Sequence, residues 1–523
     1  MNPIALGIFV NRIESICDEM GAVLRRAAFS PNIKDRMDFS CAIFDPEGGL
    51  CAQAAHIPVH LGSMAYAMKD IVTSIQWESG DMVVLNDPYL GGTHLPDVTV
   101  IAPMFIVKSD GKETLVGFVV NRAHHANIGA TSPGSMPLSQ SLEEEGLIIP
   151  PTLLVRDDVI LQDVLHRISG SEDANGKGIQ GQSYGDFSAQ ISANKVGCQR
   201  LRALISANDT DHYFQFLSEL NAYGARLATS ALSDLPNGCY QFDDYLDNDG
   251  AGQNDIKITA NITIDNGSVD VDFSGTHSQV MGNVNCPLSV AAAAVFYVFR
   301  CLMPSHTPGC AGTFSAITIR ASKGCLLDAE RPAAVAAGNV ETSTRVVDVV
   351  LGALAQAVPH RIPSASHGSM NNVAMGTEAT KDSKRWDYYE TIGGGMGAHA
   401  KGDGLNAVQT HMTNTLNTPI ESLESHYPLR VVAYRIREHS GGDGQYVGGN
   451  GLERRLKFLK PATVTLLTER RNRRPWGLGG GMGGAVGENL LNDQLLPAKT
   501  AFDVKQGDEL CIKTPGGGGW GVV

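Results

Sequence analysis

Histidine and aspartate residues occur in two stretches of the chain, and together they offer ligands for a divalent metal. His94 and Asp97 stand in the sequence Thr-His-Leu-Pro-Asp, and the adjacent pair His124 and His125 follows later in the chain. Imidazole nitrogens and carboxylate oxygens bind zinc, manganese and iron, and a set without thiolates differs from the usual structural zinc site. These residues predict a metal centre, provided that the fold brings the two stretches together.

The sequence between these stretches predicts a β-hairpin that would do so. Two runs of alternating apolar residues flank a Ser-Asp-Gly-Lys sequence at 109–112. An Asp-Gly pair in such a place is a strong hairpin signal, because a type I′ turn needs positive φ at both central residues. If Asp110 and Gly111 form a two-residue turn, Asp97 lies directly opposite His124, with the two Cβ atoms about 5 Å apart. We therefore expect the open end of the hairpin to bring this carboxylate and imidazole together.

The alternation of side chains along a strand separates the two adjacent histidines. Neighbouring residues of a strand point to opposite faces of the sheet, so His125 points away if His124 faces Asp97. A register slip of one residue would exchange the two roles. We prefer His124 as the metal ligand and keep His125 as a residue that supports a ligand or contacts substrate. His94, three residues before Asp97, completes the set that the hairpin predicts.

Two further pairs of polar residues are candidates for a role at the same site. His56 and His60 flank Pro58, and they either orient substrate or metal ligands or are ordinary polar residues of a turn. Glu144 and Glu145 have the chemistry of a general acid or base. A run of glutamates is more often a solvated loop, and we favour that interpretation here, with Glu145 kept as a candidate for the site.

Arginines form a cluster after a predicted strand near the C-terminus, at positions Arg470, Arg471, Arg473 and Arg474. Guanidinium groups in such a cluster can receive a phosphorylated intermediate or an acidic partner. A solvated cluster, or one at a subunit interface, is an equally good interpretation.

The composition is that of a globular protein. The chain has 523 residues, of which 43% are hydrophobic and 18% charged, a length typical of about two to four domains. A net charge of −14 disfavours a surface for nucleic acid. The ten scattered cysteines include no C-x-x-C pair, which favours reduced thiols in a cytoplasmic protein. We see no signal peptide, and the most apolar run, 287–303, contains Arg300, so we expect a buried helix there and no membrane span.

Hydrophobic periodicity and turn residues predict an α+β protein of mixed helices and antiparallel hairpins. The expected helices cover 3–28, 63–75, 186–206, 210–232, 287–303 and 345–357. The expected strands include 41–44, 82–85, 239–246, 255–264, 268–274, 429–437, 452–458 and 463–468. A Ser or Thr residue is available to cap the last helix. The glycine-rich tail at 514–521 can take a defined shape only by packing on other parts of the chain.

The chain is expected to be multidomain, with a break at Leu-Pro-Asn-Gly, 235–238. We predict a metal-binding catalytic domain of antiparallel hairpins and helices at 1–235 and a mixed α/β middle domain at 236–425. A β-rich, glycine-rich C-terminal domain would cover 426–523.

Ten motifs follow one another along the chain. They are DRMDFS at 35–40, HIPVHLGSM at 56–64, NDPYLGGTHLPD at 86–97, NRAHH at 121–125, EEGLIIPP at 144–151, GNVETS at 338–343, GGGMGA at 393–398, TNTLNTPIE at 413–421, LTERR at 467–471 and TPGGGGWG at 514–521. Taken in this order, they make the chain resemble the B subunit of the hydantoinase/oxoprolinase family, which includes N-methylhydantoinase B. The related subunits of ATP-dependent lactamases and of acetone and acetophenone carboxylases are similar too. The resemblance runs from residue 3 to residue 523.

The resemblance implies a ligand set and a partner. The B subunit is implied to carry the metal and complete the reaction, after an ATP-using A subunit has phosphorylated an amide or ketone oxygen. Carried over by motif, the ligands would be Asp38, His94, Asp97 and His124. The resemblance thus agrees with the set expected from the hairpin and adds Asp38.

The sequence departs from the family pattern at two positions. Asn127 stands where we expect an aspartate after the histidine pair, so a carboxylate that would support a ligand is absent. Asp35 stands where glutamate is usual, which is a mild change.

The resemblance implies a metal-dependent subunit that opens the ring of a cyclic amide or imide, such as a hydantoin, an oxoproline or a lactam. The ion would be manganese, zinc or iron. Because the sequence has no G-x-x-x-x-G-K-[ST], we expect ATP to be used by a hydantoinase A-like subunit, in a hetero-oligomer with two or more copies of this chain. Two alternatives stay open, namely a subunit of a ketone carboxylase of acetone or acetophenone type and a non-catalytic scaffold for the partner.

Overall fold

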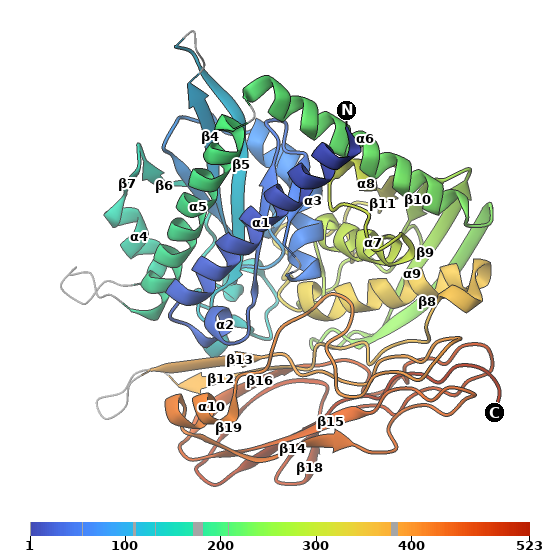
Figure 1. The fold of residues 1–523 in the computed structure, drawn as a ribbon. Coiled ribbons are helices and arrows are strands. Elements are labelled where there is room, and N and C mark those ends of the chain that lie inside the picture. The colour runs from blue at the N-terminus through green and yellow to red at the C-terminus, as the bar shows by residue number, and fades with distance from the viewer. Residues whose placement is uncertain are drawn as a thin grey trace.

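The computed structural model describes residues 2–54, 56–107, 111–130, 132–170, 181–207, 209–377 and 385–523. Helices and several sheets, most of them antiparallel, make up these residues, which confirms the expected α+β class. In Figure 1 most of the helices and the N-terminal sheet form the upper body, and the C-terminal strands, together with the short helix at 420–426, form a layer beneath it.

All six expected helices are present, with small differences in their bounds. The long helices are α1 (Pro3–Ala27), α3 (Pro58–Thr73), α5 (Gln182–Ser206), α6 (Thr210–Ser233), α7 (Leu288–Leu302) and α9 (Ser343–Ala357). The short helices include α2 (Pro31–Lys34), α4 (Gln162–Ser169), α8 (Ala311–Phe314) and α10 (Ile420–His426). α3 begins earlier than expected, so His60 lies in its first turn and not in a β-turn. The expected cap of α9 is wrong, because no side chain caps it and a π-helical turn, η4 (Gly338–Thr342), leads directly into it.

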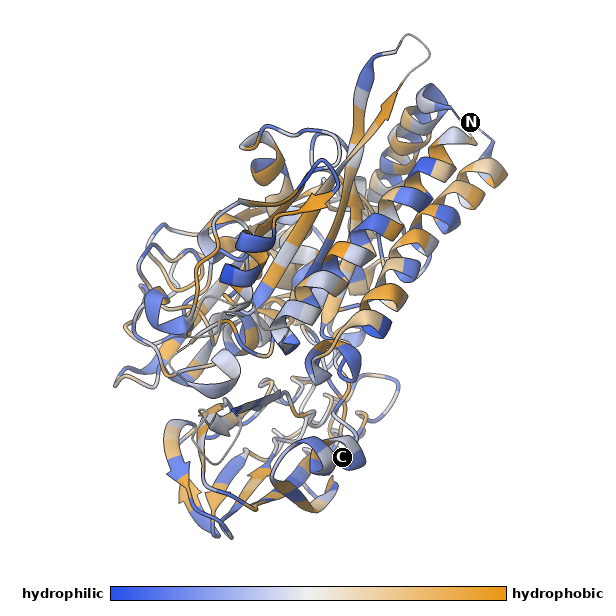
Figure 2. Cartoon of the chain, turned by 90° about the vertical axis from the view of Figure 1, so that its left-hand side faces the viewer, coloured by the Kyte–Doolittle hydropathy of each residue, from blue (hydrophilic) through white to orange (hydrophobic). Residues whose placement is uncertain are grey.

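A seven-stranded sheet contains the predicted hairpin, in the order β2-β1-β5-β4-β3-β6-β7. Its strands are β1 (Phe39–Phe44), β2 (Leu50–Gln53), β3 (Met82–Leu85), β4 (Asp97–Val107), β5 (Glu113–His124), β6 (Thr152–Arg156) and β7 (Val159–Ile160). α1 and α5 pack on one face of its centre and α3 packs on the other. In Figure 2 the strands of this sheet are largely apolar, whereas the helices beside them carry polar residues as well. The hairpin is therefore buried between two helical layers.

The register of the hairpin confirms the predicted pairing of Asp97 with His124. It holds as far as Met104, and then an extra residue on β5, Val116, shifts it. Val107 consequently pairs with Glu113. A two-residue turn at Asp110 and Gly111 requires Val107 to pair with Thr114 instead, so the predicted turn is wrong. Asp110 itself lies outside the described residues. The bulge offsets the longer connection, and the pairing at the far end of the hairpin comes out as expected.

The bulge is followed by a glycine whose position explains the residue type. Gly117 has φ +153°, and a Cβ there would lie 2.4 Å from the carbonyl oxygen of Phe44 on the neighbouring strand. Only glycine lets β1 approach the bulged strand this closely.

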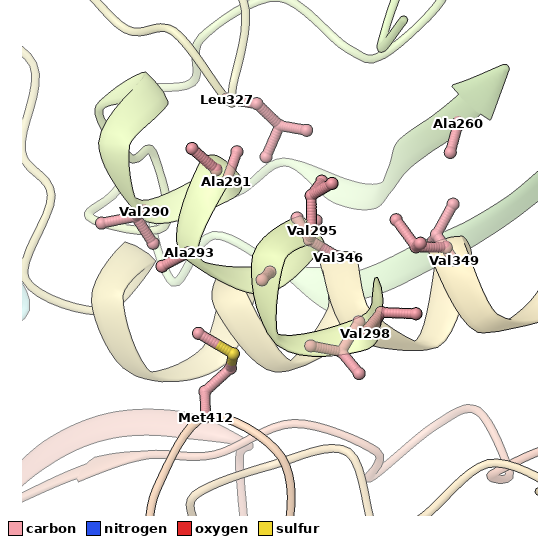
Figure 3. Close-up of a cluster of buried hydrophobic side chains, with 14 of the residues drawn as sticks. Ala260, Val290, Ala291, Ala293, Val295, Val298, Leu327, Val346, Val349 and Met412 are labelled. Carbon is pink, nitrogen blue, oxygen red and sulfur yellow. The ribbon is translucent and has the colours of Figure 1, made fainter. Parts of the chain in front are cut away.

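The apolar run at 287–303 is a buried helix, as expected, and α7 packs against α9. Figure 3 shows Val295 and Val298 of α7 beside Val346 and Val349 of α9. Helices that are apolar on all sides are buried in a core or in a membrane. Among the described helices, none combines the length and the apolar character that crossing a membrane requires.

A four-stranded sheet, in the order β11-β10-β9-β8, covers this helical pair. Its strands are β8 (Gly238–Asn248), β9 (Asn254–Asp265), β10 (Ser268–Asp272) and β11 (Ile317–Arg320). The first three confirm the expected strands and the predicted hairpin between β9 and β10.

Two further sheets form the C-terminal layer, in the orders β13-β12-β16-β19 and β14-β15-β20-β17-β18. Their strands are β12 (Asn372–Thr377), β13 (Trp386–Glu390), β14 (Leu429–Arg437), β15 (Gly451–Phe458), β16 (Ala462–Leu467), β17 (Glu488–Leu491), β18 (Gln494–Leu496), β19 (Lys499–Val504) and β20 (Glu509–Lys513). The first of these sheets joins strands from both sides of residue 425. The division into three domains stays a prediction.

Glycine-rich segments at 393–397, 441–449 and 516–519 pack against one another, and we call them the glycine bundle. Gly517 donates to the carbonyl of Gly449 at 2.9 Å, and Gly395 donates to that of Pro515 at 3.0 Å. A Cβ at Gly517 would lie 2.1 Å from the carbonyl oxygen of Met396, and one at Gly395 would lie 1.9 Å from that of Gly449. The tail thus takes its shape by packing on other backbone, as expected.

Candidate metal centre

The open end of the β4–β5 hairpin brings Asp97, His94 and His124 together in a buried site. Asp97 begins β4 and His124 ends β5, while His94 lies in the loop that precedes β4. Asp97 Oδ1 lies 3.2 Å from His94 Nε2 and 3.2 Å from His124 Nδ1. Ligand atoms about 2.1 Å from one metal ion lie about 3.0–3.4 Å apart when the angles are tetrahedral or octahedral. The spacing therefore suits a shared ion.

Unpaired polar atoms at the same place support this fit. Asp97 Oδ1 accepts no hydrogen bond of normal geometry in the described part of the chain, although two imidazole nitrogens lie close to it. Asn339 Oδ1 is also buried and without a partner among the described residues. Buried polar atoms are normally paired, so two unpaired oxygens beside the imidazoles indicate a place for a ligand.

The second oxygen of Asp97 is held firmly by three side chains. Asp97 Oδ2 accepts from Thr93 Oγ1 at 2.5 Å and from Asn339 Nδ2 at 3.3 Å. His60 Nε2, from the first turn of α3, lies 3.1 Å from the same oxygen. These contacts leave Oδ1 facing the two other imidazoles. The sequence left the role of His60 open, and the structure brings it into the site.

Asn339 belongs to this site and was missed by the sequence interpretation. Its side chain reaches from η4 to His94 Nε2, at 3.1 Å, as well as to Asp97. The motif that contains it, GNVETS, is far away in sequence and has no metal-ligand spacing. Burial of an amide inside that motif would have been the only signal, and burial of a single residue cannot be read from the sequence.

The imidazole of His94 is oriented by a hydrogen bond to the loop that contains Val335 and Ala336. Its Nδ1 donates to the carbonyl of Ala336 at 3.1 Å, which leaves Nε2 facing the site. The backbone N–H groups of Val335 and Ala336 both donate to Glu145 Oε1 at 2.8 Å. Glu145 is fully buried, so the solvated-loop interpretation is wrong for it. Burial raises the pKa of this carboxyl to about 7, although its hydrogen bonds oppose the shift.

Asp38 lies beside the three residues but not among them. Its Oδ1 is 4.0 Å from His60 Nε2, and its Oδ2 is 3.6 Å from Arg36. Asp38, His60, His124 and Asn339 line a small cavity of about 20 Å³. That volume holds about one water molecule, and it places Asp38 at the edge of the same space.

His125 and His56 point elsewhere. His125 Nε2 lies 2.9 Å from Gln190 on the α5 side of the sheet, so it faces away from Asp97 as predicted. His56 Nδ1 accepts from the backbone of Cys41 at 3.3 Å, and its ring packs on Phe39. His56 also lines a cavity of about 1100 Å³ between α1, α6 and α7. Neither histidine contacts the candidate ligands.

The electrostatics of the site favour a cation. Burial raises the pKa of Asp97, but His60 and His94 outweigh it and hold the pKa well below its usual range. Burial lowers the pKa of His94, yet the neighbouring Asp97 outweighs this and the pKa is raised overall. Burial also lowers the pKa of His124, and there its effect prevails. A charged carboxylate among imidazoles that compete for protons is a site in which a metal ion can replace those protons.

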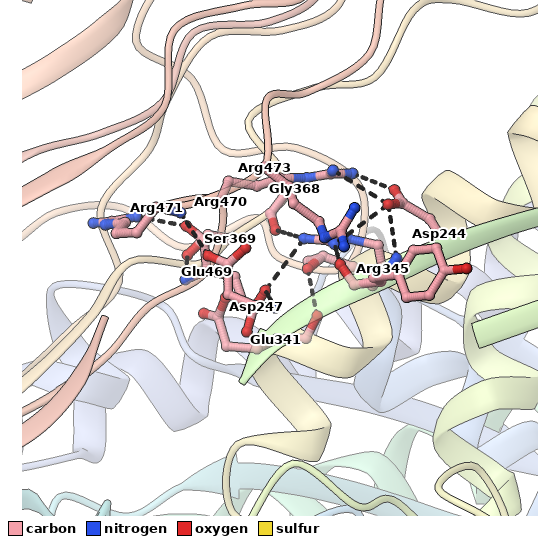
Figure 4. A network of polar contacts seen from close by, with 12 residues as sticks. Asp244, Asp247, Glu341, Arg345, Gly368, Ser369, Glu469, Arg470, Arg471 and Arg473 are labelled. Carbon is pink, nitrogen blue, oxygen red and sulfur yellow. Dashed lines mark hydrogen bonds and ion pairs between the residues drawn. The ribbon is translucent and has the colours of Figure 1, made fainter. Parts of the chain in front are cut away.

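The clustered arginines lie in a second polar region (Figure 4). Arg470 is buried and contacts Asp244 and Asp348 at 2.6 Å each. Arg471, which is partly buried, donates to Asn371 and Asn489. The solvated interpretation is therefore wrong for Arg470, while Arg473 forms an exposed pair with Asp255 at 2.7 Å.

Comparisons with known proteins give a consistent picture. The family model described as hydantoinase B/oxoprolinase matches residues 2–523. 5-oxoprolinase 1 of Arabidopsis thaliana is 38% identical over 555 residues, which cover 99% of this chain and 42% of that protein. The B-type subunit of a putative D-/L-hydantoinase from Pseudomonas sp. strain NS671 is 30% identical over 100% of this chain and 90% of its own length. The chain thus spans about two-fifths of its oxoprolinase relatives and nearly all of that hydantoinase polypeptide.

Solved structures share the fold over the whole chain. The ATP-dependent caprolactamase of Pseudomonas jessenii has a TM-score of 0.90 and 25% identity, and the match covers 91% of that chain. Acetone carboxylase has a TM-score of 0.87 and 18% identity, with 76% of that chain covered, which shows a common fold only.

Proposed function

The chain belongs to the hydantoinase B/oxoprolinase family, and on this premise we propose that it is the metal-dependent catalytic subunit of an ATP-dependent hydrolase acting on a cyclic amide or imide. The observation that carries the proposal is Asp97 Oδ1, a buried carboxylate oxygen shared by two imidazoles at 3.2 Å. The names of two relatives, an oxoprolinase and a caprolactamase, support a cyclic amide as the substrate class.

His94, Asp97 and His124 would hold the ion, with Asp38 as a fourth ligand from the edge of the small cavity. A divalent ion bound there would lower the pKa of water and polarise the carbon–oxygen bond under attack. Asn339 and His60 keep the carboxylate of Asp97 in one orientation through its second oxygen. Mixed nitrogen and oxygen ligands suit manganese, zinc or iron.

The energy for ring opening would come from a partner. The sequence contains no phosphate-binding loop of the usual type, and relatives such as the 5-oxoprolinases are more than twice as long as the matching part. We propose a hydantoinase A-like subunit that phosphorylates the amide oxygen with ATP, so that this chain receives an activated amide. The assembly would contain two or more copies of this chain.

The test is an assay of the complex of this chain with its ATP-using partner against hydantoins, 5-oxoproline and lactams. Ring opening that needs ATP and a divalent ion is expected, and Asp97→Asn should abolish it while the complex still forms. Ketone carboxylation by the same complex, without ring opening, would instead support the carboxylase alternative. Undiminished ring opening in Asp97→Asn would leave this chain as a scaffold.

A further inference from the structure

The two imidazoles of the candidate metal centre are held in different ways. His94 has a hydrogen bond from its second ring nitrogen to the carbonyl of Ala336. The second nitrogen of His124 is buried without a partner among the described residues. Metal-binding histidines normally take their ring orientation from that second hydrogen bond. Something else must therefore fix the plane of His124.

Tyr389 lies where it can do so. Its ring is parallel to the imidazole of His124, with centroids 4.6 Å apart and an angle of 9° between the planes. Tyr389 comes from β13, in the C-terminal layer, whereas His124 ends β5. The stack is thus a contact between two distant parts of the chain.

Tyr389 is itself fixed by a short chain of hydrogen bonds. Its hydroxyl donates to Asn372 Oδ1 at 2.7 Å, and Asn372 Nδ2 donates to Glu341 Oε1 at 2.7 Å. Glu341 Oε1 also accepts from the backbone N–H of Met370 at 2.9 Å. These side chains are all buried, so the chain is not weakened by water.

Glu341 also lies on the turn that provides Asn339, because both residues belong to η4. Asn339 thus contacts His94 and Asp97 directly. Glu341 reaches His124 through Asn372 and Tyr389, so η4 is linked to both imidazoles.

We propose that Tyr389 is a positioning residue that sets the plane of the His124 imidazole, and that Asn372 and Glu341 hold Tyr389 in place. This role of Tyr389 rests on the proposed function, in which His124 binds a metal ion. The stack replaces the hydrogen bond that His124 lacks. Loss of the Tyr389 hydroxyl leaves Asn372 Oδ1 unpaired and frees the ring to tilt, and the imidazole tilts with it.

The first experiment measures metal affinity in Tyr389→Phe with Tyr388→Phe as the matched control. Tyr388 is the neighbouring residue on the same strand, equally buried, and it packs on Tyr427 away from the site. Tyr389→Phe is expected to bind Zn²⁺ or Mn²⁺ about tenfold or more weakly, as other supports of metal ligands do. The visible spectrum of the Co²⁺ form should change as well. Wild-type affinity and spectrum in Tyr389→Phe would overturn the proposal.

A second pair of variants tests the far end of the chain. Glu341→Gln keeps an acceptor for Asn372 and should bind metal as the wild type does. Glu341→Ala removes the acceptor and should resemble Tyr389→Phe in affinity and spectrum. A merely structural role for Glu341 predicts lower thermal stability in Glu341→Ala with unchanged metal affinity, and that result would remove Glu341 from the proposal.

The stack can also be tested without metal. In metal-free protein labelled with ¹³C at the histidine Cε1 positions, the His124 resonance is identified by its loss in His124→Gln. Tyr389→Leu should move this resonance downfield, because the ring current of Tyr389 is lost, whereas Tyr388→Phe should leave it in place. An unmoved resonance in Tyr389→Leu overturns the stack. If the wild type takes up no metal, the proposed function fails, and this measurement still decides whether Tyr389 orients His124.

Discussion

The buried charged residues around Arg470 and those around Asp97 differ in how their carboxylates are compensated. In the cluster around Arg470, guanidinium groups contact Asp244 and Asp348 directly. Around Asp97, the contacts come from imidazoles, a hydroxyl and an amide, and among the described residues neither lysine nor arginine pairs with it. Arginine is charged at every accessible pH, whereas an imidazole is not.

The difference supports our proposal that the cluster around Arg470 is structural and the one around Asp97 binds a metal. Asp244 and Asp348 are neutralised by the protein itself, and nothing further needs to bind. Asp97 is buried without a permanent positive partner, which is costly unless protons or a metal ion supply the charge. Both clusters are buried, so burial alone does not distinguish them. The source of the positive charge does.

The largest effect is expected from removing one imidazole at Asp97. His94→Ala and His124→Ala should each lose the metal and the ring-opening activity while the fold persists, because a required ligand is gone. His125→Ala should keep the metal, since its ring faces Gln190. Elemental analysis of the three purified variants, beside circular dichroism, is the measurement.

Two outcomes of that experiment would break the comparison. If all three variants stay loaded, the ion binds elsewhere, and the uncompensated carboxylate of Asp97 has another explanation. If His125→Ala empties the site and His124→Ala does not, the orientation of the two histidines is the reverse of that described.

The sequence predicted the pairing at this end of the hairpin because the signals for it, alternation and turn residues, lie within the hairpin segment itself. Alternation turned His125 away from Asp97, and the assumed two-residue turn placed Asp97 opposite His124. The predicted turn was wrong and the result was still right, since the bulge at Val116 offsets the longer connection. A bulge is set by contacts with the neighbouring strand, here at Gly117, and alternation along one strand does not contain it.

The parts of the site that the sequence missed are those that come from distant segments. Asn339 and Tyr389 reach the site from η4 and β13, and no periodicity links them to the hairpin. Glu145 looked like a solvated glutamate because it ends a run of three glutamates, and the first of them, Glu143, is indeed exposed. Its burial depends on the backbone of Val335 and Ala336, nearly two hundred positions away.

The glycine bundle shows the same limit in another form. Its segments have few side chains and hence no pattern of burial to read. The sequence indicated that the tail must pack on something, but the partners, such as Met396 for Gly517, follow only from the fold.

In the cluster around Arg470, we expect a substitution to lower the stability of the protein and to leave metal binding unchanged. Arg470→Met should destabilise the protein by about 3–5 kcal/mol, since it leaves Asp244 and Asp348 buried without their main partner. Urea or thermal denaturation measures this cost, and the folded fraction should bind metal as the wild type does. Loss of metal from folded Arg470→Met would show that the two clusters are one coupled unit.

A smaller effect is expected at Glu145, whose hydrogen bonds hold the loop that positions His94. Glu145→Ala removes the acceptor for two backbone N–H groups in the loop that holds His94, so metal affinity should fall about tenfold. Glu145→Gln keeps an acceptor oxygen and should bind metal nearly as the wild type does. Competition with a chromophoric chelator gives both affinities. Equal weakening in the two variants would mean that the charge of Glu145 acts on the site directly, and not its hydrogen bonds.

The smallest effect is expected for Arg473→Ala, which serves as the matched control for Arg470→Met. Arg473 belongs to the same run of arginines and also contacts a carboxylate, Asp255, at 2.7 Å. Its side chain is 40% exposed and that of Asp255 is 66% exposed, so water and salt screen the pair. The guanidinium also lies 4.5 Å from the ring centroid of Tyr245. An exposed pair of this kind contributes about 0.2–1 kcal/mol, and the loss in Arg473→Ala should shrink as the salt concentration rises. Denaturation at low and high salt measures it. If Arg473→Ala loses as much free energy of unfolding as Arg470→Met does, and the loss does not depend on salt, then burial does not explain why these two arginines contribute differently to stability.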